Sequence, residues 1–185
     1  MIATLRPHSF ADLQRMPDDL FRYKILDGEL IASAASPAAH HRVHGALLRI
    51  IDAHARQSQA GEVIIGPFYV VLGHYDAVPP NLVFLSASRP QVPDDATYLS
   101  HAPDMIAEVI SPSTRAIDLV RKMALYARSG VPEYWIADPD GRELVINVLR
   151  DDEYAPAAPV TDVLIASPTL TGLRVDPAEV FAGLK

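Results

Sequence analysis

One carboxylate lies inside an apolar run and gives the strongest sign of chemistry in the sequence. The run is MIAEVI, residues 105–110, and Glu108 is its single charged residue. Burying an unpaired carboxylate costs free energy, so such a side chain either neutralises itself or finds a partner. Glu108 therefore predicts a nearby cation, a basic side chain or an edge position that faces water.

The segment that follows offers a candidate partner. Asp118, Lys122, Tyr126 and Gly130 occur at intervals of four, so on a helix Lys122 lies one turn from both Asp118 and Tyr126. One interpretation is a surface Asp–Lys pair that stabilises the helix by about 0.2–0.5 kcal/mol. In the other, Lys122 turns back toward Glu108, because this helix directly follows the strand that carries the carboxylate.

An earlier predicted helix carries two more groups of interest. His40 and His44 are spaced to chelate a metal, but the motif lacks the Glu of the zinc proteases and a third ligand, which favours exposed or capping histidines. Arg42, Arg49 and Arg56 recur every seven residues and form a basic stripe. The stripe is either a solvated face or a surface that contacts phosphates.

Composition limits the class of protein. A chain of 185 residues with 49% hydrophobic content predicts one globular domain over 1–185. It has no cysteine, no apolar run near the ~20 residues of a membrane span and no signal-peptide core in its first residues, so we expect a cytoplasmic protein without a membrane partner. The net charge of −7 argues against indiscriminate nucleic-acid binding but permits a local basic surface.

The hydrophobic pattern predicts an α/β domain. Several expected strands are continuous apolar runs, which is typical of a mixed sheet covered by helices on both faces. Asp27-Gly28 suits the type I′ turn of a hairpin. Helices are expected over 10–15, 37–59, 115–129 and 177–181, and strands over 23–26, 29–31, 62–72, 82–85, 104–110, 133–137, 142–149 and 173–175.

Several fragments together resemble one family. They are DGEL from Asp27, SPxxH from Ser36, the 106–114 strand and loop, and KxxxYxxxGVPEYWxxDP from Lys122. The sequence contains no Walker A loop, dinucleotide-binding glycine motif or Gly-x-Ser-x-Gly elbow that would indicate another class of enzyme. From about residue 10 to residue 154 the chain is similar to the Uma-two family of restriction-endonuclease-like domains, within the PD-(D/E)xK nuclease superfamily.

The resemblance implies a restriction-endonuclease-like fold, a central mixed β-sheet flanked by helices, and a metal-dependent phosphodiesterase site on adjacent strands. It implies Glu108 and the Val109 carbonyl as ligands of Mg²⁺ or Mn²⁺, with Lys122 orienting the attacking water in place of Ile110. Glu29 would be a further acid supporting the site. Carboxylates suit such a hard cation, which lowers the pKa of bound water and neutralises phosphate charge.

The chain departs from the family pattern at two positions. Asn81 stands where the family has the Asp of Pro-Asp, and it can offer the metal one oxygen but no negative charge. Lys24 stands where the family often has an acid. Asp104 cannot compensate for Asn81, because four residues of extended strand separate it from Glu108 by about 13 Å. Asp76 could fold back into the site, but the family resemblance favours Glu29 as the substitute for the missing Asp.

Three functions are compatible with these residues. The leading one is a metal-dependent DNA endonuclease with Glu108, Lys122, Glu29 and Asn81 as catalytic residues, impaired by the missing Asp. The second is a catalytically inactive nuclease-fold module that binds nucleic acid or protein, in which the arginine stripe matters more than Glu108. The third is a self-associating protein, a homodimer built on the first hairpin or on an exposed segment around Tyr134-Trp135.

Overall fold

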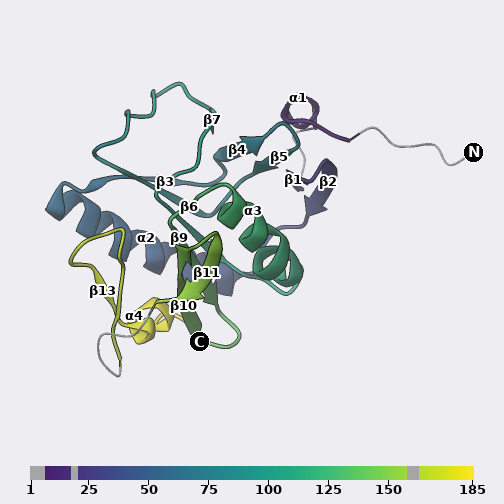
Figure 1. Cartoon of the computed structure of the whole chain (residues 1–185). Helices are drawn as coiled ribbons and strands as arrows, with labels where there is room; N and C mark the ends of the chain where they lie inside the picture. The colour runs from purple at the N-terminus through teal and green to yellow at the C-terminus, as the bar shows by residue number, and fades with distance from the viewer. Residues whose placement is uncertain (1–6, 18–20, 158–162) are drawn as a thin grey trace, which may run out of the picture.

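The protein is built around a six-stranded mixed sheet. The computed structural model describes residues 7–17, 21–157 and 163–185. The strand order of this sheet is β11-β10-β9-β8-β6-β3 (Figure 1). Its strands are β3 (Gly61–Ile65), β6 (Leu82–Ser86), β8 (Met105–Val109), β9 (Glu133–Asp138), β10 (Glu143–Arg150) and β11 (Glu153–Pro156).

Strand β8 lies in the interior of this sheet, between β6 and β9. It pairs antiparallel with β6 and parallel with β9, and all five of its residues are buried. All six residues of β9 are buried as well, including Tyr134 and Trp135. The expectation that these two aromatic residues form an exposed contact segment is therefore wrong, because the parallel pairing with β8 places them in the core.

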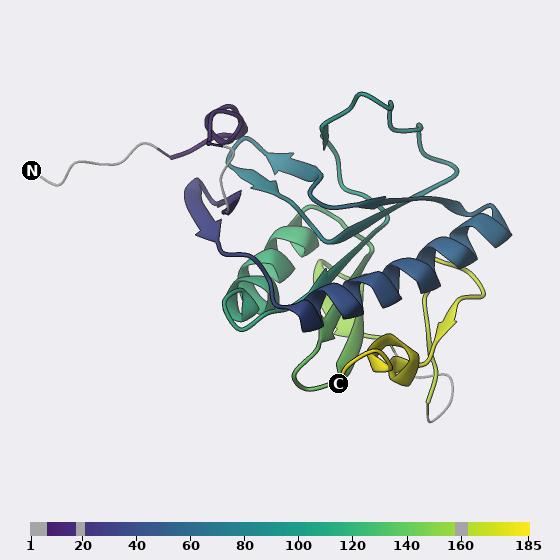
Figure 2. The same cartoon turned by 180° about the vertical axis from the view of Figure 1, so that it is seen from behind.

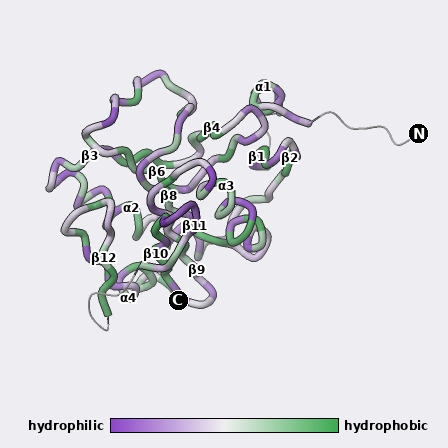
Figure 3. The backbone as a smooth tube through the Cα atoms, viewed as in Figure 1, coloured by the Kyte–Doolittle hydropathy of each residue, from purple (hydrophilic) through white to green (hydrophobic). Residues whose placement is uncertain are grey.

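Helices cover both faces of the sheet. Helix α2 (Ala38–Ser58) lies across one face and is nearer the viewer in Figure 2, whereas the helical segment before β9 covers the other face and is nearer the viewer in Figure 1. Val43, Leu47 and Ile51 of α2 recur at helical spacing and pack into the core with Phe84 and Trp135. The colouring of α2 in Figure 3 accordingly changes between hydrophilic and hydrophobic within single turns.

The second helical segment has two parts. It begins as a π-helical stretch, η1 (Ile117–Lys122), and continues as helix α3 (Met123–Arg128). A single helix was expected here, and the wider π-helical turns form where the segment faces Glu108. π-helical turns are rare and occur often at functional sites. Leu125 and Tyr126 anchor the segment to the sheet.

A second, five-stranded sheet packs beside the first, in the order β2-β1-β5-β4-β7. Asp27 and Gly28 both have positive φ, 52° and 78°, which confirms the type I′ turn of its first hairpin. Its strands are β1 (Arg22–Leu26), β2 (Glu29–Ser33), β4 (Tyr69–Gly73), β5 (Asp76–Val78) and β7 (Tyr98–Leu99).

The prediction of one strand over 62–72 is wrong. The chain leaves the first sheet after β3 and enters the second as β4. Gly66 and Pro67 make the passage: a Cβ at Gly66 would collide with the Pro80 carbonyl, and Pro67 has no N–H to donate to a ladder. This passage brings the second sheet, and with it β1, against the end of β6.

The remaining elements close the ends of the fold. Helix α1 (Phe10–Leu13) begins at the expected residue, with Ser9 as its N-cap, and ends two residues early. Helix α4 (Pro177–Phe181) packs on α2 after the short pair β12 (Ile165–Ala166) and β13 (Arg174–Val175). A mixed sheet with helices on both faces confirms the predicted α/β class. Within the described ranges, no helix has the length and apolar character that a bilayer crossing requires.

Candidate functional site

Glu108 lies on the face of β8 that η1 and α3 cover. Successive side chains of a strand point to opposite faces. Met105, Ala107 and Val109 accordingly pack with α2, while Ile106 packs with Tyr126 of α3. Glu108 is in phase with Ile106, which directs its carboxylate toward the helical segment.

The Glu108 carboxylate is held by three donors. Lys122 Nζ lies 2.6 Å and Tyr126 Oη 3.0 Å from its Oε1. The backbone nitrogen of Asn81 donates to its Oε2 over 3.4 Å. Lys122 also forms an ion pair of 2.9 Å with Asp118. Glu108 and Lys122 are only 3% and 4% exposed. The prediction that Lys122 turns toward Glu108 is confirmed, and the surface-pair interpretation is wrong.

The three charged groups of this cluster carry one excess negative charge. Burial raises the pKa of Glu108 above its ordinary value, and Lys122 opposes that rise. Burial alone would lower the pKa of Lys122, but the nearby Glu108 and Asp118 outweigh it and raise that pKa. Both shifts favour protons in the cluster, as expected when two acids share one cation.

Asn81 links the cluster to helix α2. Its Oδ1 accepts a hydrogen bond of 2.8 Å from the Val109 N–H, so its Nδ2 is the atom that faces His40 Nε2, at 3.3 Å. An amide nitrogen donates, so Nε2 accepts and the proton of the neutral ring is on Nδ1. Burial, and then the charges of His41 and His44, lower the pKa of His40 to about 4, which keeps the ring neutral. In the described part of the chain, His40 Nδ1 has no hydrogen-bond partner.

Lys24 enters the same region from β1. It is only 5% exposed, and among the described residues no hydrogen bond or ion pair holds its ammonium. Burial, and then the charge of Lys122, lower its pKa to about 8, against smaller opposing effects of Asp118 and Glu108. A buried cation without a close partner is unusual, because its desolvation is uncompensated.

These side chains line one small cavity of about 40 Å³ between the two sheets and the start of α2. Its floor holds Asn81, Glu108, Asp118 and Lys122, and its walls include Lys24 and His40. Val109 and Arg22 also line it. The structure therefore brings together three of the four predicted catalytic residues and all three predicted metal ligands.

Glu29 is not brought to the cavity. Its side chain is 63% exposed and pairs with Arg121 at 2.7 Å, on the outer side of η1. Asp118 takes the place of the second acid instead. Asp76 does not fold back into the site either, since it accepts from the Asp27 N–H and pairs with Arg128. The hairpin turn directs Glu29 outward because its strand lies at the edge of the second sheet.

The sequence arguments underestimated Lys24, Arg22 and His40. The chain has three lysines, and two of them, Lys24 and Lys122, are buried in this one cavity. That scarcity was the available signal, because buried lysines are rare unless they are paired or functional. His40 is buried, so the expectation of an exposed or capping histidine is wrong for it.

The predicted arginine stripe lies on the outer surface of α2. Arg42, Arg49 and Arg56 are all exposed. Arg56 pairs with Asp52 at 2.7 Å, one turn away, which reduces its net positive charge locally. The first turn of the same helix carries His40, but Arg42 follows it by two residues, about 200° around the helix, so the stripe faces away from the cavity that His40 lines.

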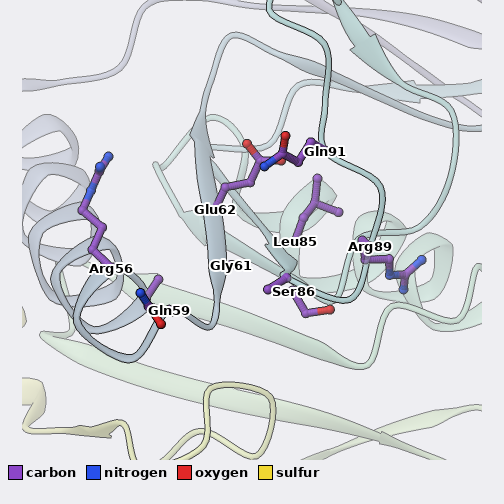
Figure 4. A pocket seen from close by; sticks show the side chains of 10 residues that line it. Arg56, Gln59, Gly61, Glu62, Leu85, Ser86, Arg89 and Gln91 are labelled. Atoms are coloured by element: carbon purple, nitrogen blue, oxygen red, sulfur yellow. The ribbon is translucent and has the colours of Figure 1, made fainter.

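A larger hollow of about 420 Å³ lies at the other end of α2. Figure 4 shows Arg56 on the helix at one side of it and Arg89 on the loop at the other. Arg89 is held by Asp104 at 2.9 Å, and Glu62 accepts from the Val92 N–H. Its charged groups are thus engaged by near neighbours, and the small cavity is the better candidate for chemistry.

The residues of the small cavity do not fit a divalent cation. The Glu108 Oε1 is engaged by Lys122 and Tyr126, and the Asn81 Oδ1 by the Val109 N–H. Two lysines balance the two acids, whereas a hard cation needs a surplus of carboxylates. Within the described ranges, no cluster of three His, Asp or Glu residues is arranged to hold a metal.

Comparison with known proteins assigns this chain to a family. A family model described as "Uma2: Putative restriction endonuclease" matches residues 10–178. The chain belongs to the Uma2 family. A solved structure, described as a "putative nuclease" of DUF820 from Anabaena variabilis ATCC 29413, has a similar fold, with a TM-score of 0.79 at 14% identity over 95% of this chain and 98% of that one. The restriction-endonuclease-like fold is thereby confirmed. No curated protein matches the chain in sequence.

Proposed function

We propose that this chain is a restriction-endonuclease-like domain that binds DNA and whose metal-dependent hydrolysis is strongly impaired. Membership of the Uma2 family supports a nuclease-like function. The observation that carries the proposed impairment is the pairing of Glu108 with Lys122 in a cavity that also holds Asn81 and Lys24. The family resemblance implies acids at these last two positions. Losing carboxylate charge from a site for Mg²⁺ or Mn²⁺ weakens the metal and the chemistry that depends on it.

The DNA contact is proposed for the exposed outer surface of α2, which carries the arginine stripe. Arg42, Arg49 and Arg56 span fourteen residues of helix, which corresponds to about 21 Å at the α-helical rise. Exposed guanidinium groups along one face of a helix suit contacts with phosphates. The overall charge of −7 makes the remaining surface unfavourable for DNA, so this stripe would also orient the protein on its partner.

The second candidate is a working metal-dependent DNA endonuclease. The observation that favours it is the convergence of Glu108, Lys122 and Asn81 on one cavity, which the nuclease resemblance implied. Against this candidate, Asp118, the second carboxylate of the cavity, is paired with Lys122.

One experiment separates the two candidates. Supercoiled and linear DNA are incubated with the wild type and with Glu108→Gln, in Mg²⁺ and separately in Mn²⁺, and binding to the same DNA is measured by fluorescence anisotropy. We expect binding without cleavage. Cleavage by the wild type that Glu108→Gln abolishes would establish the second candidate, and the absence of both binding and cleavage would overturn the proposed function.

A further inference from the structure

Three potential hydrogen-bond donors face the small cavity without partners. Among the described residues, neither Lys24 Nζ nor the Arg22 guanidinium has a hydrogen bond or ion pair, and the Nδ1–H of His40 has no acceptor. Lys24 and His40 are both more than nine-tenths buried. Buried donors are normally satisfied by protein, water or a ligand, so this set points to an acceptor that enters from outside.

The charges of the cavity point to an anion. Glu108 and Asp118 contribute two negative charges, while Arg22, Lys24 and Lys122 contribute three positive ones. The balance is one positive charge. The two oxygens of Glu108 already accept from Lys122, Tyr126 and the Asn81 N–H, so its negative charge is directed into the floor and not toward the mouth.

We propose that this cavity binds a phosphate group directly, with the Lys24 ammonium in the role that a divalent cation has in metal-dependent nucleases. The inference deepens the proposed function, since it names what the former hydrolytic site of the DNA-binding domain would hold. Arg and Lys are the side chains that bind phosphate oxygens best, and Arg22 at the mouth can donate in a bidentate manner.

The size of the cavity supports a phosphate group over a larger anion. A volume of about 40 Å³ holds roughly three water-sized groups. Such a small volume suits the non-bridging oxygens of a phosphate group better than a base or a sugar. The lowered pKa of Lys24, about 8, still leaves its ammonium charged at neutral pH.

The chemistry is shared by free phosphate, a strand-end phosphate and an internal phosphodiester. Affinities are therefore measured for inorganic phosphate and for two oligonucleotides of one sequence, with and without a 5′-phosphate. Calorimetric titrations use the wild type, Lys24→Met and Arg150→Met, the last as a control because Arg150 is exposed at the end of β10 and does not line the cavity.

We expect Lys24→Met to weaken binding of the phosphate-bearing probe at least about tenfold, as for the loss of one charged hydrogen bond. Arg150→Met should leave this binding unchanged. Preference for the 5′-phosphorylated oligonucleotide would identify a strand-end phosphate as the ligand. Equal binding of both oligonucleotides would identify an internal phosphodiester. Binding of inorganic phosphate alone would identify a site for free phosphate. Unchanged affinity in Lys24→Met would overturn the inference.

Arg22→Met provides a second test if Lys24→Met does not fold, because Arg22 is exposed and its replacement leaves the core intact. It should also weaken phosphate binding, and equal affinity would count against the cavity. DNA binding that survives both substitutions would refute the phosphate site and leave the proposed function standing. Phosphate binding without any DNA binding would refute the proposed function and leave the phosphate site standing.

Discussion

The side chain at position 81 decides how the cavity is balanced without a metal. Asn81 accepts from the Val109 N–H and donates to His40, so both ends of its amide are used. An aspartate could accept from Val109 but would have no proton for His40 Nε2. It would also place a second carboxylate beside Glu108. Asn81 and Lys24 are therefore compatible with each other, and both suit a site that contains no divalent cation.

The presence of both Asn81 and Lys24 predicts that acids at these two positions would create a metal site. The double variant Asn81→Asp with Lys24→Glu adds three units of negative charge to the cavity. We expect it to be less stable than the wild type without metal, because buried like charges repel, and to gain stability from Mn²⁺ or Mg²⁺, by about 2.7 kcal/mol at 100 times the Kd. Thermal unfolding with and without metal measures both effects.

The control for that prediction is Glu108→Gln in the double variant, which should remove the metal-dependent rise in Tm. A wild type stabilised by the same metals to the same degree would show that the present residues already form a metal site.

A second prediction at the residue scale follows from the pKa of Lys24. Its lowered value, about 8 against an ordinary 10.5, means that the unfolded chain holds this proton more firmly than the folded one. The cost of burying the ammonium is thus fully present below pH 8 and is relieved as the pH rises toward 10.5. The charged groups that face Lys24 across the cavity are Arg22, Glu108, Asp118 and Lys122, and His40 faces it as a neutral ring.

Sulfate serves as the probe because its charge, unlike that of phosphate, is constant over this range. We expect the rise in Tm caused by sulfate to be largest below pH 8 and to disappear as the pH passes from about 8 to 9 and Lys24 loses its proton. The same titration of Lys24→Met should show no such step. A sulfate effect that is independent of pH in the wild type would contradict the assignment.

At the scale of elements, Lys122 is the side chain of the η1–α3 segment that pairs with both buried acids of the site. Lys122 and Arg121 are neighbours on η1, but Lys122 lies between two buried acids and Arg121 pairs with the exposed Glu29. Removing one partner of a buried pair leaves an uncompensated charge, so Lys122→Met should lower the free energy of unfolding by about 3–5 kcal/mol. Arg121→Met should cost about 1 kcal/mol or less.

Urea denaturation of the two variants measures this difference directly. Glu108→Gln combined with Lys122→Met should recover part of the loss, since it removes one of the two stranded acids. Equal destabilisation by Lys122→Met and Arg121→Met would show that the buried cluster adds little to the stability of the fold.

Sequence patterns predicted the elements of this fold better than their arrangement. Glu108 and Lys122 were found because a charge in an apolar run must be compensated, and helix periodicity fixed where its partner would lie. The 62–72 run was misassigned because an apolar pattern does not reveal that a chain changes sheets at Gly66-Pro67. Lys24 was recognised only as a departure from the family pattern, since its burial results from the packing of β1 against the first sheet.

At the scale of the whole molecule, self-association remains a prediction. With Tyr134 and Trp135 in the core, the first hairpin is the remaining expected contact, and its strand β2 is an edge of the second sheet. Edge strands offer unpaired backbone groups to a second copy. Sedimentation equilibrium should then give twice the 20.2 kDa mass of the chain. A single-chain mass at micromolar concentration would remove the homodimer.

The distribution of charge over the molecule predicts how DNA binding responds to salt. A protein of net charge −7 approaches DNA most favourably with its local basic surfaces, so few phosphates are contacted. Each phosphate contact contributes about 0.9 to the slope of log K against log salt. Replacing Arg42, Arg49 and Arg56 with Met should therefore flatten the slope by up to about 2.7, and by less if the Arg56–Asp52 pair persists on DNA.

The control is Arg150→Met, since Arg150 is exposed at the end of β10, and this variant should leave the slope unchanged. An equal slope for the wild type and the triple variant would place the DNA contact on another surface.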